Sequence, residues 1–229
     1  MPDMSPTHIV FPLFVGVTQL DFTGPLQFLS RLPGAQIHIA AADTAPVPTD
    51  SVLQLLPTTC FADCPKADIL CVPGGHGVTT ALHDQAILDF IANQAASARW
   101  VTAVCTGAFL LGGAGLLHGK RATTHWGYTH LLPMVGAIPT AGRVIEDGHI
   151  ITAGGVTSGI DFALTLIARE AGEDVARAIQ LALEYDPQPP FTGGHPDSAP
   201  APILSEIRAR FYDAAATRMA DALATMPKI

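Results

Sequence analysis

The sequence is poor in charge, and the charge it has is mostly negative. Charged residues make up 14% of the 229 residues, and 12 basic residues stand against 20 acidic ones, which gives a net charge of −8. No run of basic residues occurs that would hold a phosphate backbone, so we expect no nucleic-acid partner. Gly, Pro or charge interrupts the apolar runs well short of a bilayer-spanning length, so we expect no membrane segment.

Cysteine is scarce as well, with four residues: Cys60, Cys64, Cys71 and Cys105. Cys60 and Cys64 have a spacing that invites a metal interpretation, but no second Cys or His pair with ligand spacing follows nearby, so we expect no metal site. A chain of this length needs no disulfide framework. Its first residues lack a basic region and a small-residue cleavage site, so we expect no signal peptide and a cytoplasmic protein.

Apolar material, in contrast, is abundant. Hydrophobic residues make up 48% of the chain, which suits one large α/β domain or such a domain with an appendage. The surplus over the needs of a single core favours a buried subunit interface, and hence a homodimer.

Strand-like and helix-like segments alternate, which is typical of a mostly parallel sheet covered by helices on both faces. Between Asp186 and Pro202 six prolines disrupt this pattern, so we predict a main domain over 1–185 and a Pro-rich segment with a final helix over 186–229, packed on the same domain or on a partner. The expected strands are 8–14, 35–42, 68–73, 100–105 and 121–125, with hairpin elements at 51–58 and 143–152; the expected helices are 21–32, 83–98, a segment after Cys105, 126–135, 158–171, 173–184 and 203–226.

A single thiol stands at a sharp corner of this pattern. The apolar run Trp100–Val104 reaches Cys105, and Thr106 and a glycine-rich apolar segment follow. Strand, turn and helix in this order predict a nucleophile elbow. A helix N-terminus favours the thiolate, so we expect Cys105 to be ionised and catalytic. A buried, inert cysteine at the end of a strand is the alternative.

Two further features follow strands and are therefore expected at the same edge of the sheet. The loop Gly74–Gly77 comes after the strand that ends at Pro73. We predict that the N–H groups of Gly75 and Thr106 form an anion hole beside the sulfur, with a plain turn as the alternative. His76 would close the mouth of the pocket.

Asp21 is the other feature, and it stands between apolar Leu20 and Phe22. A carboxyl group in such surroundings has a raised pKa and can exchange protons, although Asp is also a common helix N-cap. The Thr106 hydroxyl cannot act as a base near neutral pH, so we expect it to hydrogen-bond the Asp21 carboxyl or a polar atom of a substrate.

Residues near two later strands complete the predicted pocket. His125 follows a possible strand and is the histidine best placed to approach Cys105, as a proton carrier or as an ordinary packed side chain. Gly154 and Val156 follow the hairpin, and Val156 would supply an apolar wall.

These residues carry a family resemblance that extends over most of the chain. The elbow and the Gly-Gly loop resemble the PfpI branch of the class I glutamine-amidotransferase-like superfamily, and more narrowly its isocyanide hydratase group. The segments that carry the resemblance are QLDFTGP (19–25), FADCPKADILCVPGG (61–75), VCTGAFLLGGAGLLHGKRATTHW (104–126), GIDFALTL (159–166) and LEYDPQPPFTGGHPDSAP (183–200).

The resemblance implies a flavodoxin-like three-layer sandwich, a homodimer, and no metal or organic cofactor. It also implies hydration of a small-molecule isocyanide to an N-substituted formamide. Cys105 would attack the terminal carbon and form a thioimidate, Asp21 would act as general acid and base, and Thr106 would orient Asp21. Thr106 differs from the His that follows Cys in peptidase-like members, which argues against a hydrolase.

Three other functions stay open at this point. A glyoxalase-like enzyme of the same superfamily is one, although such enzymes usually have Glu where this chain has Asp21. A ligand-sensing module, as found fused to AraC-type DNA-binding domains, is another, although the sequence shows no basic recognition helix. A redox sensor that uses an accessible, low-pKa Cys105 is the third.

Overall fold

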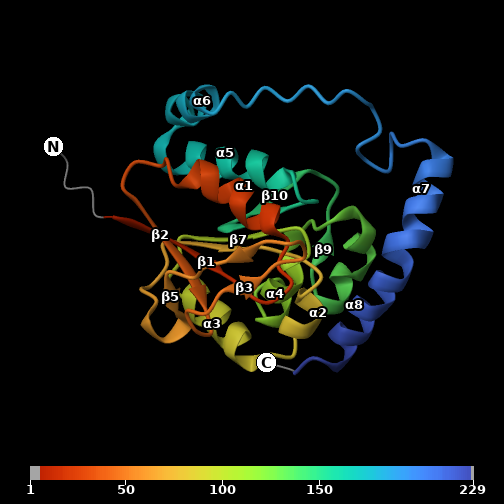
Figure 1. Cartoon of the computed structure of the whole chain (residues 1–229), viewed down its shortest axis with the longest axis horizontal. Coiled ribbons are helices and arrows are strands. Elements are labelled where there is room, and N and C mark those ends of the chain that lie inside the picture. Colours follow the sequence, from red (N-terminus) through yellow and green to blue (C-terminus); the bar gives the residue numbers. More distant parts are fainter. Residues whose placement is uncertain (1–5, 228–229) are drawn as a thin grey trace.

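A seven-stranded sheet forms the centre of the molecule in a computed structural model, which describes residues 6–227 (Figure 1). Six strands are parallel and the edge strand β10 is antiparallel to β11. The predicted domain boundaries at 1 and 229 lie outside the described residues. In spatial order the strands are β10 (Val144–Asp147), β11 (Ile150–Ala153), β7 (Trp100–Val104), β6 (Ile69–Val72), β1 (Thr7–Pro12), β2 (Ala35–Ala41) and β5 (Thr59–Cys60).

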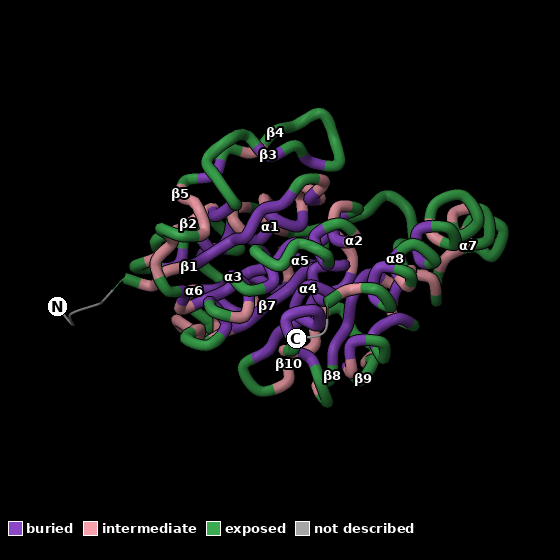
Figure 2. Tube along the Cα trace, turned by 90° about the horizontal axis from the view of Figure 1, so that it is seen from below, coloured by how far each residue is buried: buried purple, intermediate pink, exposed green. Residues whose placement is uncertain are grey.

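The central strands are buried on both faces, as the tube in Figure 2 shows. All four residues of β6, Ile69–Val72, are buried, and so are Val101–Val104 of β7. Their apolar side chains alternate between the two faces, so each strand contributes to two separate cores. Continuous rather than alternating hydrophobicity is what a parallel sheet covered on both sides requires.

Helices cover both faces of this sheet and make the predicted three-layer sandwich. One layer contains α1 (Gln19–Leu29), α5 (Ser158–Ala171) and α6 (Glu173–Ala182), and the other contains α2 (Val78–Ala81), α3 (Gln85–Ala95) and α4 (Gly107–Gly113) (Figure 1). The predicted fold class is therefore confirmed. The predicted helix 158–171 and the hairpin expected at 143–152 agree with the structure.

Two predicted elements differ from the structure. Only β8 (Arg121–Ala122) of the expected strand 121–125 is paired, with β9 (Ile138–Pro139) outside the main sheet. Beyond it the Thr123 N–H donates to the Thr152 side chain, so the strand ends early. The expected helix 126–135 is a 3-10 helix, η2 (Trp126–Val135).

The remaining short elements lie at the periphery. The hairpin arm expected at 51–58 contains β4 (Gln54–Leu55), which pairs antiparallel with β3 (Val47–Pro48). A short 3-10 turn, η1 (Phe61–Asp63), follows β5.

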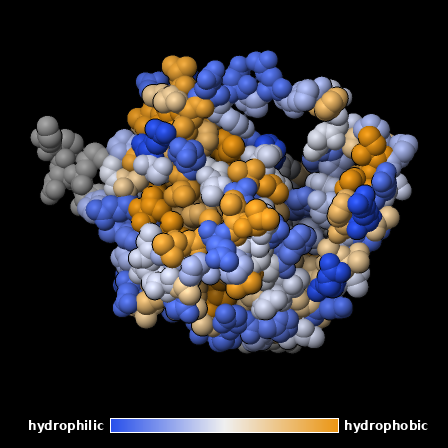
Figure 3. Space-filling model, viewed as in Figure 1, coloured by the Kyte–Doolittle hydropathy of each residue, from blue (hydrophilic) through white to orange (hydrophobic). Residues whose placement is uncertain are grey.

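The C-terminal segment leaves the body and returns to it. Residues 186–200 run as an exposed, extended chain, and Figure 3 shows an opening between this chain and the body. The single helix predicted from Ile203 consists of α7 (Ala201–Ile207), a π-helical turn η3 (Arg208–Tyr212) and α8 (Asp213–Thr225). Buried residues of α8 face η2 and α2 of the same chain.

Among residues 6–227, no helix combines the length and the apolar character needed to cross a membrane.

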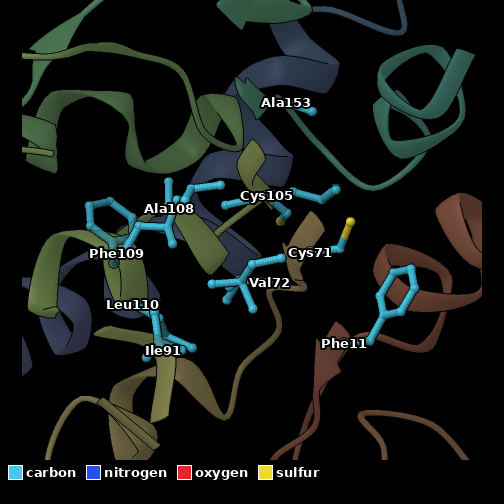
Figure 4. Packing of buried hydrophobic residues seen from close by; sticks show 14 of the residues in the cluster. Phe11, Cys71, Val72, Ile91, Cys105, Ala108, Phe109, Leu110 and Ala153 are labelled. Atoms are coloured by element: carbon cyan, nitrogen blue, oxygen red, sulfur yellow. The ribbon is translucent and has the colours of Figure 1, made fainter. Parts of the chain in front are cut away.

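The corner between β7 and α4 is a tight and strained part of the backbone. Cys105 has a φ of +57°, a left-handed value that non-glycine residues rarely adopt. At Gly107 a Cβ atom would lie 2.4 Å from the carbonyl oxygen of Val72 and 2.7 Å from that of Pro73. The close approach of α4 to the end of β6 therefore requires glycine at this position. Figure 4 shows Cys105 in its packing environment, with Ala108 and Phe109 from α4 and Ala153 from β11.

We predict that Gly107→Ala destabilises the fold by about 1–3 kcal/mol, because the new methyl group meets backbone oxygens that cannot rotate away. Urea unfolding measures this loss. Gly24→Ala is the matched control, since Gly24 lies within α1 and a Cβ there would make ordinary contacts with the side chains of Ile160 (3.6 Å) and Leu20 (3.8 Å). A variant at Gly107 as stable as the one at Gly24 would contradict the prediction.

Candidate active site

Three backbone contacts hold the Cys105 elbow. The Cys105 N–H donates to the carbonyl oxygens of Ala153 (3.0 Å) and Gly154 (2.9 Å) at the end of β11. From the other side the Thr124 hydroxyl donates to the Cys105 carbonyl at 2.6 Å. Neighbouring elements thus fix the strained corner, and the predicted site residue Gly154 lies beside it. The Cys105 side chain is buried, with 6% of the residue exposed.

The Asp21 carboxyl group faces the Cys105 thiol from α1. The helix begins at Gln19, with Thr18 as its N-cap, so Asp21 lies in the first turn and the N-cap alternative is wrong. The residue is 1% exposed, and its Oδ2 accepts the Gly74 N–H at 3.1 Å. Within the described part of the chain its Oδ1 has no hydrogen-bond partner. One acceptor oxygen is therefore held and the other is free to meet a reactant.

Burial controls the protonation of both groups. It raises the pKa of Asp21 to about 7, against the lowering effects of its contacts with Cys105 and Gly74. Burial, together with the charge of Asp21, also raises the pKa of the Cys105 thiol well above its usual range. Burial and the Asp21 charge therefore act against the expected resting thiolate, which the N-terminus of the short helix α4 favours. The pair instead holds a thiol beside a carboxyl group that titrates near neutrality.

Thr106 connects the elbow to the Gly-Gly loop instead of orienting Asp21. Its hydroxyl accepts the Gly75 N–H at 2.9 Å and donates to the Gly75 carbonyl at 3.2 Å. The Gly75 N–H is therefore occupied, and the predicted anion hole loses this donor. The Thr106 N–H remains directed at the Cys105 sulfur and acts to lower the pKa of the thiol. Gly75 has a φ of +137°, and a Cβ there would lie 2.4 Å from Thr18 N.

His125 does not have the geometry of a proton carrier. Its Nδ1 accepts the Gly127 N–H at 3.1 Å, so in the neutral ring the proton lies on Nε2, which is 3.3 Å from the Tyr212 hydroxyl. Burial lowers the pKa of His125 to about 4. With both nitrogens engaged and the ring neutral, His125 is a packed side chain of the site wall.

The other predicted residues lie around this centre. The His76 side chain is exposed at the start of the loop that leads into α2, and Val156 is half-buried before α5. Cys60 Sγ donates to Asp63 Oδ2 at 2.9 Å, and burial raises the pKa of Cys71 to about 12. Over residues 6–227, no cluster of three or more His, Cys, Asp or Glu side chains could hold a metal ion.

Comparison with known proteins agrees with this geometry. The profile of the DJ-1/PfpI family matches residues 7–169, which include the elbow, the Gly-Gly loop and Asp21. The chain belongs to the DJ-1/PfpI family. A relative from Pseudomonas putida, named isonitrile hydratase, is 55% identical over 203 residues, which is 89% of each chain.

Two further proteins are similar to this chain over most of its length. A solved structure of a ThiJ/PfpI family protein from Pseudomonas syringae superposes with a TM-score of 0.88 at 39% identity, and the match covers 95% of this chain and 92% of that one. The transcriptional regulator GbdR of Pseudomonas aeruginosa is 29% identical over 192 residues, which is 80% of this chain but 52% of the regulator.

Sequence reasoning missed two aromatic residues of this DJ-1/PfpI site. Tyr128 is buried in η2, and Tyr212 reaches His125 from η3. Tyr212 lies outside the matched residues 7–169. The hydrogen bond to His125 spans 87 residues of sequence, and no local pattern signals such a contact.

We predict that Asp21→Asn raises the melting temperature Tm, and that the rise is larger near pH 8 than near pH 4. The difference between the two rises is roughly 4 °C or more. The folded pKa of about 7 exceeds the ordinary 3.8. The contribution that protonated Asp21 makes to folding stability is therefore fully present below the pKa of the unfolded state, and it is lost as pH rises through about 7. Asparagine carries no charge at either pH.

Thermal unfolding of Asp43→Asn is the matched control. Asp43 is exposed, and its carboxylate also accepts a backbone N–H, that of Ala45 at 2.8 Å. Equal pH dependence of Tm in the two variants would count against a raised Asp21 pKa.

Proposed function

We propose that this chain is an isocyanide (isonitrile) hydratase, which adds water to R–N≡C and forms the formamide R–NH–CHO. The observation that carries the proposal is the buried pair of the Cys105 thiol and the Asp21 carboxyl group, with threonine instead of a base after the cysteine. An isocyanide carbon needs both a nucleophile and a proton, and the pair supplies both. The name of the relative at 55% identity supports the same reaction.

The first step forms a thioimidate on the sulfur. The Asp21 carboxylate takes the thiol proton while the sulfur attacks the terminal carbon. The protonated Asp21 then delivers that proton to the carbon, which gives R–N=CH–S–Cys105 with Asp21 again ionised. The thiol supplies the bond and the proton, so no external acid is required. Because the raised pKa of Asp21 lies near neutrality, its carboxyl group can both accept and donate a proton near neutral pH.

The second step releases the formamide. Asp21 accepts a proton from water as the water oxygen bonds to the thioimidate carbon, and it passes this proton to the nitrogen. Collapse of the tetrahedral intermediate breaks the C–S bond and forms the carbonyl group, while Asp21 takes the proton of the new hydroxyl group and delivers it to the departing sulfur. Oδ1, which has no partner among residues 6–227, is the oxygen we assign to the water. The Thr106 N–H acts on the departing sulfur, which it stabilises.

The supporting residues keep this pair in place. Thr106 is a positioning residue, because its hydroxyl ties Gly75 to the elbow while Gly74 holds Asp21 Oδ2. We assign Gly154, Val156, His76 and the His125 ring to the walls around the substrate. A glyoxalase-like reaction is less favoured because the carboxyl group comes from Asp21, which has a shorter side chain than the usual Glu.

We also propose a homodimer. Large apolar side chains are exposed near the β3–β4 hairpin, among them Val15 (68%), Val52 (97%) and Leu56 (66%). Figure 3 shows apolar side chains gathered on this side of the molecule. A second copy would remove them from water. A cytoplasmic location stays a prediction.

We predict that brief mixing with an isocyanide raises the intact mass of the protein by the mass of one isocyanide, because thioimidate formation loses no atoms. Cys105→Ala abolishes both the adduct and formamide production. Cys60→Ala, which removes a half-buried thiol elsewhere, retains both. Intact-mass spectrometry and formamide analysis check this outcome, and turnover by the Cys105 variant would refute the assignment.

The pH dependence of kcat/KM tests the Asp21 role. Below a pKa of about 7 the carboxyl group is protonated and cannot take the thiol proton, so we predict that kcat/KM rises with pH through this value and then levels off. Initial rates across the pH range measure it. A profile already flat from about pH 5 upward would show that Asp21 has an ordinary pKa and a different role.

A further inference from the structure

Four rings gather between η2 and the C-terminal segment. Tyr212 stacks on His125 with ring centroids 4.9 Å apart and planes at 26°, and it lies 4.6 Å from the Trp126 ring. Tyr128 meets Tyr212 edge to face at 6.1 Å. His125, Trp126, Tyr128 and Tyr212 thus form a compact aromatic cluster of stacked and edge-to-face rings.

Local backbone features place Tyr212 in this cluster. Tyr212 is the last residue of the π-helical turn η3, a rare geometry that often occurs at functional sites. At Gly127 a Cβ atom would lie 2.8 Å from the Tyr212 ring, so the absence of a side chain there admits the ring. Two independent features, a π turn and a glycine, therefore accommodate one tyrosine.

The aromatic cluster is coupled directly to the elbow. Thr124, the neighbour of His125, donates to the Cys105 carbonyl at 2.6 Å. A Cβ at Gly155 would lie 2.8 Å from the His125 ring, so the ring packs on the loop that receives the Cys105 N–H. Tyr212 in turn stacks on the His125 ring, so the tyrosine is linked to the elbow through His125.

An open hollow continues from the cluster toward solvent. Its volume is about 500 Å³, and Trp126, Tyr212 and Leu131 are among its lining residues. Arg208 lies over the Trp126 ring at 5.9 Å from the centroid. A hollow of this size holds a group as large as a substituted benzene ring, and Tyr212 stands between it and His125.

We infer that Tyr212 is a specificity-determining residue, whose ring packs against the R group of the isocyanide and favours flat aryl isocyanides over non-planar alkyl ones. The inference rests on the proposed function. As the sulfur attacks the terminal carbon, the linear isocyanide directs R away from the sulfur, and the aromatic cluster is an apolar surface coupled to that elbow. Offset or edge-to-face contacts between rings add to simple burial of area, whereas a cyclohexyl group gains only the burial.

The experiment compares phenyl isocyanide with cyclohexyl isocyanide, two R groups of equal carbon count and different planarity. We expect Tyr212→Leu to lower the aryl-to-cyclohexyl ratio of kcat/KM roughly three- to tenfold, mainly through KM for the aryl substrate. Tyr212→Phe keeps the ring and keeps the ratio. Because both substrates are measured on one preparation, a loss of folded protein cancels in the ratio.

Tyr185→Leu is the matched control. Tyr185 is another partly buried tyrosine with a hydroxyl contact, to Asp161 at 2.8 Å, and an edge-to-face contact with Phe28 on the α1 side. An unchanged ratio in Tyr212→Leu, or an equal fall in the Tyr185 variant, would overturn the inference. Wild-type protein that hydrates neither isocyanide would instead overturn the proposed function, so the two failures are distinguishable.

Discussion

A thiol and a carboxyl group, buried together, form the interaction on which the rest of this structure depends. Burial away from water destabilises the ionised form of Asp21, and the same burial favours the protonated form of Cys105. Neither group is activated alone. Each can change its protonation only by exchange with the other or with a bound molecule. In the proposed reaction, this coupling lets the two groups act together as nucleophile and proton carrier.

The backbone N–H groups around Cys105 and Asp21 hold these two side chains in place. The N–H groups of Gly74 and Gly75 are used by Asp21 and Thr106, and the Cys105 N–H is used by the end of β11. These contacts join α1, the loop after β6, the elbow and β11 in one network. Their cost in strain is concentrated at Cys105, whose φ is +57°. Groups held in this way need little rearrangement during the reaction.

The C-terminal segment adds a second level of organisation to the shared fold. The family match ends at residue 169, whereas the chain continues through an extended segment to η3 and α8. Helix α8 packs on η2, and η3 brings Tyr212 against His125. A common α/β layer thus carries the reacting pair, and a later segment shapes the surface next to it. Under the proposed function, this division separates the reacting pair from the residue that we infer to select the substrate.

Local sequence determined the central strands, α5 and the elbow at Cys105, because hydrophobic periodicity acts over short distances. It also determined the convergence of Asp21 with the elbow, because loops that follow parallel strands meet at one edge of the sheet. Only the tertiary structure decided that Cys105 rests as a thiol, that Thr106 binds Gly75, and that His125 is neutral and bonded to Tyr212. Protonation depends on total burial, and hydrogen-bond partners depend on which distant segments meet. Neither quantity is encoded in the residues adjacent to the site.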